Sequence, residues 1–183
     1  APPACPEEMA MGKVSDISKP ASATLVISRM LDAPPQEVFG AWTQPDRLRQ
    51  WLSPKAFTCP FCEIDLRPGG TVRVCMRSVE GKDYWSRGEY LEIVEPERLV
   101  YTDSFADADG NTVSPQTYGM GAEWPVEALV TVTFANEEGR TRLTLEHSPL
   151  PAGEQRDMCR QGWNECLDKL AAYLAAPQTE AER

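Results

Sequence analysis

TLVISRMLDAPPQEVFGAWTQPDRLRQWL, residues 24–52, is the stretch that decides the fold class of this 183-residue chain. Its first part, Thr24–Leu31, is apolar and partly β-branched, which predicts a strand. Pro34 and Pro35 suit the first turn of a helix, because an N–H is not needed there. Apolar residues at helical spacing follow, and Pro45 marks the start of a second short helix. The stretch therefore predicts a strand followed by a bent pair of helices.

Composition and charge narrow the class of protein. The chain is 42% hydrophobic and 25% charged, which is ordinary for a globular domain. A net charge of -10 speaks against nucleic acid and against anionic membrane surfaces as partners. No apolar run approaches the roughly 20 residues of a membrane span. Six cysteines are too few for a disulfide scaffold, and no secretory signal is visible, so we expect a cytoplasmic protein.

The order of elements predicts one domain between two tails. Residues 1–22 lack periodicity and predict a flexible N-terminal tail, residues 23–176 the domain, and residues 177–183 a C-terminal tail. After the helix pair we expect strands at Phe61–Arg67, Thr71–Ser78, Tyr84–Val94, Arg98–Phe105, Val126–Ala135 and Thr141–His147, a long loop over 106–125, and a final helix at Gly153–Ala175.

This order is typical of an α+β helix-grip fold. A curved antiparallel sheet of about six to seven strands has one apolar face, and the amphipathic C-terminal helix is available to cover it. The two short helices then close one end. The helix positions expected to be buried include Met158, Cys166 and Leu170. Since a straight helix cannot contact a curved sheet along its full length, the gap between them is a candidate cavity.

The chain resembles the bacterial family named for its similarity to the activator of the heat-shock protein 90 ATPase. That family belongs to the START-like, or SRPBCC, helix-grip superfamily. The resemblance rests on APPQEVFGAWTQPDRLRQWL (33–52), DLRPGGTVRVCMR (65–77), RGEYLEIVEPERLVYTDSF (87–105), VTVTF with GRTRLTLEHSPLP (130–151) and GWNECLDKLAAYL (162–174). It implies a scaffold shared by lipid and hormone binders, polyketide cyclases, stress-related proteins and co-chaperones.

Six residues are candidates for ligand contacts. Aromatic side chains suit a pocket for a flat apolar ligand, and methionine suits an adaptable lid. The long loop carries two candidates, and the final helix, which the sheet is expected to grip, carries three. The candidate ligand-binding residues are Trp51, Met120, Trp124, Met158, Cys159 and Trp163.

His147 and Asp103 are the candidates for catalysis. His147 is the only histidine, and it shares a strand phase with Leu143 and Leu145, so we expect it to point inward. An inward histidine is either a general base or a hydrogen-bonded structural residue. From the sequence alone we claim no pairing of His147 with a nucleophile. Asp103, in phase with Leu99, is a candidate cavity acid or a surface ion-pair partner.

Cys59-Pro60-Phe61-Cys62 is the most unusual local motif. A C-x-x-C pair can hold zinc, form a reversible disulfide or exchange thiols, and it can also be inert. Thiol exchange favours a helix start after the pair, whereas here a strand is expected. Zinc would need two further ligands. We expect Cys59 and Cys62 to be reduced and inert, with no metal.

The leading hypothesis is a non-enzymatic protein that binds a small hydrophobic molecule between sheet and helix. It needs no cofactor, and we expect a monomer or homodimer. The first alternative is a cyclase- or hydrolase-like enzyme that uses His147 and Asp103 in the same cavity. The second is an interaction module related to the co-chaperone.

Overall fold

A computed structural model describes residues 23–177. The predicted N-terminal tail, and the predicted C-terminal tail apart from Pro177, lie outside the described residues. The elements, in chain order, are β1 (Ala23–Leu31), α1 (Pro35–Thr43), α2 (Pro45–Leu48), β2 (Phe57–Ile64), β3 (Thr71–Ser78), β4 (Asp83–Val94), β5 (Arg98–Ala106), η1 (Pro115–Tyr118, a 3₁₀ turn), β6 (Ala128–Glu137), β7 (Arg140–Leu150) and α3 (Glu154–Ala175). None of the helices among residues 23–177 is long and apolar enough to cross a membrane.

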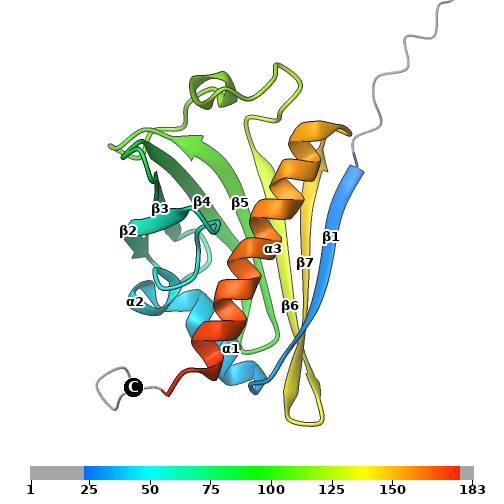
Figure 1. Cartoon of the computed structure of the whole chain (residues 1–183). Helices are drawn as coiled ribbons and strands as arrows, with labels where there is room; N and C mark the ends of the chain where they lie inside the picture. Colours follow the sequence, from blue (N-terminus) through cyan, green and yellow to red (C-terminus); the bar gives the residue numbers. More distant parts are fainter. Residues whose placement is uncertain (1–22, 178–183) are drawn as a thin grey trace, which may run out of the picture.

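The strands form one antiparallel sheet that α3 crosses on one face (Figure 1). Within residues 23–177 the seven strands follow the order β1-β7-β6-β5-β4-β3-β2. The short helices α1 and α2 lie at one end of the molecule, and the loop between β5 and β6 lies at the opposite end (Figure 1). The predicted helix-grip fold, a curved antiparallel sheet around a long C-terminal helix, is confirmed.

Strand β2 begins and ends earlier than its sequence suggests. The strand expected at Phe61–Arg67 is β2 at Phe57–Ile64, so the C-x-x-C motif lies inside the strand rather than before it. A proline is tolerated there for two reasons. First, β2 is an edge strand, so one side of it needs no ladder hydrogen bonds. Second, the register shifts between Thr58 and Phe61, which removes Pro60 from regular pairing.

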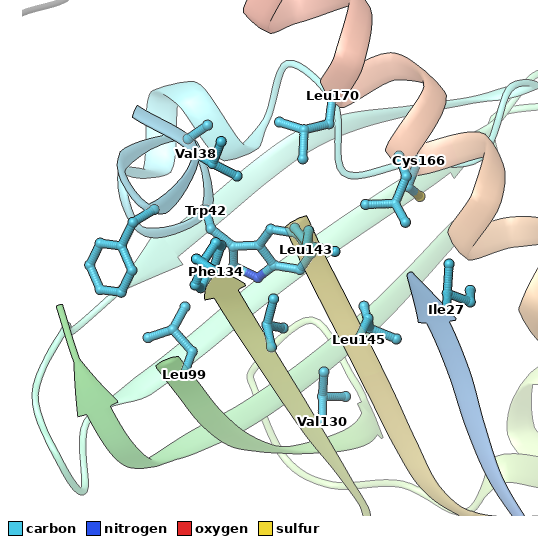
Figure 2. Close-up of a cluster of buried hydrophobic side chains, with 14 of the residues drawn as sticks. Ile27, Val38, Trp42, Leu99, Val130, Phe134, Leu143, Leu145, Cys166 and Leu170 are labelled. Atoms are coloured by element: carbon cyan, nitrogen blue, oxygen red, sulfur yellow. The ribbon is translucent and has the colours of Figure 1, made fainter. Parts of the chain in front are cut away.

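The core lies where the C-terminal half of α3, helix α1 and strands β6 and β7 meet (Figure 2). Trp42 of α1 is 3% exposed and packs edge-on against Phe134 of β6, with ring centroids 5.9 Å apart. Leu170 of α3 is fully buried beside them. At about 25 cal/mol per Å² of buried apolar surface, such large side chains supply most of the stabilisation. The core therefore fixes one end of α3 firmly.

The N-terminal half of α3 is less buried than its periodicity suggests. Cys166, Leu167 and Leu170 are buried, as expected, but Met158 is 64% exposed, so the expectation that it is buried is wrong. The physical reason is geometric: the sheet curves while α3 is straight (Figure 1), and the first half of α3 lines a cavity instead of packing against the sheet. That space is the cavity.

Candidate ligand cavity

A cavity of about 480 Å³ lies between the first half of α3 and the sheet. Strands β3, β4 and β5 form its floor, the segment from Tyr118 to Pro125 borders it, and Leu48 and Leu52 close the end near α2. Five of the six candidate ligand residues line it: Met120, Trp124, Met158, Cys159 and Trp163. Asp103 and His147 also line it.

Trp51, the sixth candidate, lies in the core and is absent from the cavity lining. Its side chain is fully buried, and its ring lies 4.6 Å from that of Trp42. Its indole N–H donates to the Ala41 carbonyl oxygen at 3.0 Å, which ties the segment after α2 to α1. Trp51 therefore packs at the end of the molecule closed by α1 and α2, whereas Trp42 both packs there and lines the cavity.

Aromatic rings form much of the cavity wall. Tyr90 and Tyr101 meet edge-on across β4 and β5, with centroids 5.9 Å apart. Tyr118 of η1 lies 5.4 Å from Tyr84 and 5.3 Å from Phe105. Because alternate residues of a strand face the same side, neighbouring strands bring these rings together on one face. The result is a wall suited to a flat apolar molecule.

Hydrogen bonds to the sheet and to α3 hold the β5–β6 loop beside the cavity. The Tyr118 hydroxyl donates to the Ala106 carbonyl oxygen at 2.6 Å, which fixes η1 to the end of β5. The Gly121 N–H donates to Gln155 Oε1 at 3.0 Å, which fixes the loop to the first turn of α3. Met120 and Trp124 are thereby held at the cavity by the sheet on one side and the helix on the other.

A polar cluster centred on His147 occupies one side of the cavity. His147 of β7 is 4% exposed. Its Nε2 lies 3.4 Å from Asp103 Oδ2 of β5, although Nε2 makes no well-formed hydrogen bond. On the other side of the ring, Nδ1 accepts a hydrogen bond from Trp163 Nε1–H at 3.2 Å and lies 3.8 Å from Cys159 Sγ. Two elements, β5 and α3, thus approach the imidazole that β7 carries.

Opposing influences set the protonation of His147. Burial disfavours the charged ring, and so does Trp163, whose N–H needs a lone pair on Nδ1. The Asp103 carboxylate and the Cys159 sulfur act the other way and outweigh burial, raising the pKa of His147 to about 9. In the neutral ring the Trp163 bond puts the remaining proton on Nε2, towards Asp103. The ring can therefore exchange a proton at Nδ1.

The proximity of Cys159 to His147 is the part of the site that sequence reasoning missed. Ser148 follows His147 directly, but neighbouring residues of a strand face opposite sides, so the sequence pairs no nucleophile with the inward face of His147. The available signal was the spacing of Cys159 and Trp163, which are four residues apart and so share one face of a helix. What the spacing could not show is that this face lies over the end of β7.

The C-x-x-C motif lies within β2. Cys59, Cys62, Cys75, Cys159 and Cys166 are all free thiols. Burial raises the pKa of Cys59 to about 11 and that of Cys62 to about 12, so both stay protonated at neutral pH. Within residues 23–177 no three His, Cys, Asp or Glu side chains are grouped to hold a metal ion.

Fold and cavity together define the class, a START-like helix-grip protein. The chain belongs to the activator of Hsp90 ATPase homolog 1-like family, whose model matches residues 32–175. A crystal structure of a protein from Chromobacterium violaceum shares 31% identity with it, covers 85% of this chain and 98% of its own, and has a TM-score of 0.69.

Two further solved structures are similar to the chain. A protein from Rhizobium leguminosarum shares 28% identity, with 84% of this chain and 95% of its own covered and a TM-score of 0.63. A family protein from Silicibacter pomeroyi shares 25% identity, with 84% and 98% covered and a TM-score of 0.63. A search of curated proteins finds no match.

Proposed function

We propose that this protein binds a small apolar or aromatic molecule in the cavity between α3 and the sheet. The observation that carries the proposal is the cavity itself, which has a volume of about 480 Å³ and mostly apolar walls rich in aromatic side chains. Sites for small molecules and cofactors usually have volumes of about 300–1,000 Å³ and mostly apolar walls with a few polar groups. A rigid apolar ligand would displace poorly held water and bury its surface against the rings.

The polar cluster indicates how such a ligand would be oriented. The Tyr90–Tyr101 side of the cavity offers ring faces, whereas the His147 side offers a ring nitrogen, a carboxylate and a thiol. A ligand with an apolar body and one polar end matches this asymmetry. We also propose a cytoplasmic location, because free thiols among residues 23–177 fit a reducing compartment.

Gly162 provides a way to test the proposal without disturbing the fold. It lies on α3 and lines the cavity, and a Cβ added there would meet only Pro54 Cγ at 3.8 Å. A helix also tolerates other residues better than glycine, by roughly 0.5–1 kcal/mol for alanine. Gly162→Leu should therefore preserve the fold while filling part of the cavity, and Gly162→Ala should be at least as stable as the wild type.

The experiment is a fluorescence titration with the neutral apolar dye Nile red. We expect the wild type and Gly162→Ala to bind one dye molecule, and Gly162→Leu to bind at least about tenfold more weakly, a loss of about 1.4 kcal/mol. Gln161→Leu is the matched control, because it adds the same side chain at an exposed neighbouring position. Equal affinity in Gly162→Leu and the wild type, or equal loss in Gln161→Leu, would contradict the proposal.

The second function, an enzyme in the same cavity, is favoured by a specific observation. His147 contacts both a carboxylate and a thiol, and such groups together can activate a nucleophile.

A further inference from the structure

We propose that Cys159 is a nucleophilic thiol that forms a covalent bond to apolar α,β-unsaturated carbonyl compounds in the cavity. In this arrangement His147 activates the thiol, and Asp103 orients the imidazole of His147. This rests on the proposed ligand-binding function and deepens it, because it names the chemical class of the ligand. The geometry is a chain of contacts: Cys159 Sγ to His147 Nδ1 at 3.8 Å, and His147 Nε2 to Asp103 Oδ2 at 3.4 Å.

This arrangement has the parts that nucleophilic catalysis requires: a nucleophile, a base within reach and a third group that orients the base. His147 is only 4% exposed, so its ring cannot turn freely away from the thiol. The thiol lines the cavity and is within reach of a ligand. The Asp103 carboxylate 3.4 Å from Nε2 stabilises the positive ring that forms once Nδ1 holds the thiol proton, so the geometry favours a Cys159 thiolate paired with a charged His147.

Gln155 supplies a donor for the ligand carbonyl. It lies four residues before Cys159, on the same face of α3, and lines the cavity. Because its Oε1 accepts the Gly121 N–H at 3.0 Å, the two hydrogens on Nε2 remain for another acceptor. A carbonyl oxygen that gains negative charge during addition is the kind of acceptor such a donor stabilises.

The reaction is a simple addition. Cys159 Sγ transfers its proton to His147 Nδ1 and attacks the β-carbon of the unsaturated carbonyl compound. The S–C bond forms as the C=C π bond breaks, and its electrons move to the carbonyl oxygen beside Gln155 to give an enolate. The proton on Nδ1 then passes to the α-carbon. The product is a thioether, with no leaving group and no change in overall oxidation state.

Trp163 lowers the reactivity of the Cys159 thiol in the wild type. Its N–H donates to the same Nδ1 lone pair that would accept the thiol proton. Replacing it with phenylalanine keeps an aromatic ring beside Trp42, which stacks on Trp163 at 6.3 Å, and removes the competing donor. Trp163→Phe should therefore make Cys159 more reactive, and only when His147 is present.

The first test measures the reactivity of each cysteine towards iodoacetamide at neutral pH by peptide mass spectrometry. We expect Cys159 to react at least about tenfold faster than Cys62, whose thiol stays protonated. His147→Gln should slow Cys159 about tenfold or more, and Asp103→Asn should slow it less. Trp163→Phe should speed it severalfold, and the Trp163→Phe/His147→Gln double variant should lose that gain. An unchanged rate in His147→Gln would overturn the proposal.

The second test uses cinnamaldehyde, an apolar aromatic unsaturated aldehyde, followed by intact-protein mass spectrometry. We expect one adduct, mapped to Cys159 and absent in Cys159→Ser. Gln155→Glu keeps an oxygen for the Gly121 N–H but loses the donors, so it should slow cinnamaldehyde addition more than iodoacetamide labelling. If Cys159→Ser binds Nile red while the wild type forms no adduct, the covalent step is wrong and the binding function stands. If the protein neither binds Nile red nor forms a cinnamaldehyde adduct, both the binding function and the covalent step are wrong.

Discussion

At the scale of single residues, burial and neighbouring charge act in opposite directions on the protonation of His147. A buried imidazole is normally neutral, yet the Asp103 carboxylate 3.4 Å away favours the charged ring. The Trp163 N–H opposes that charge from the other side. A residue held between such partners is poised to exchange a proton, and residues of this kind gather at functional sites.

The raised pKa of His147 makes the stability of the protein depend on pH. The pKa is raised from 6.5 to about 9 in the folded protein. The stabilisation is therefore fully present below pH 6.5 and is lost as the pH rises through about 9. We expect urea denaturation to show that the wild type loses up to about 3 kcal/mol relative to His147→Gln across this window. Parallel stability curves for the two proteins would contradict the assignment.

At the scale of elements, α3 packs into the core through its C-terminal half and borders the cavity with its N-terminal half. Lys169 contributes strongly to this attachment. Its Nζ donates to Ser53 Oγ at 2.9 Å and to the carbonyl oxygens of Pro54 at 2.9 Å and Phe57 at 3.0 Å. One ammonium group thus joins α3 to the segment between α2 and β2, beside the end of the cavity that Pro54 lines.

Removal of this ammonium group should loosen that attachment. Lys169→Met keeps the aliphatic stem but removes the donor that Ser53 Oγ and the carbonyl oxygens of Pro54 and Phe57 share, of which the Phe57 oxygen keeps a second donor, the Ser53 hydroxyl. We expect a loss of about 1–3 kcal/mol in the free energy of unfolding. Lys55→Met is the control, because Lys55 is an exposed lysine in the same segment. Chemical denaturation monitored by circular dichroism measures both. Equal stability of the two variants would show that Lys169 is not a structural tie.

Elements governed by local signals could be predicted from the sequence, and those governed by register could not. Pro35 and Pro45 start α1 and α2 as expected, because proline acts through its own backbone. The predicted position of β2 was wrong, because the register shift around Pro60 depends on how β2 pairs with the neighbouring strand. The pairing of His147 with Cys159 depends on how α3 crosses the sheet, which no short stretch of sequence encodes.

At the scale of the whole molecule, the cavity follows from a mismatch of shapes. The sheet curves, α3 is straight, and the large core side chains gather towards the end where α1 lies (Figures 1 and 2). The other end remains as a space of about 480 Å³ bordered by the loop that carries Met120 and Trp124. One and the same fold therefore supplies both the stable core and the proposed site.

The indole N–H signals of the five tryptophans offer the most direct test of the proposed binding. In a ¹⁵N–¹H NMR titration with Nile red, we predict that the signals of Trp163 and Trp124, which line the cavity, shift until one dye is bound per chain. The signal of Trp51, whose N–H is fixed to Ala41 in the core, should stay in place. Unshifted Trp163 and Trp124 signals at saturating dye would contradict a ligand site between α3 and the sheet.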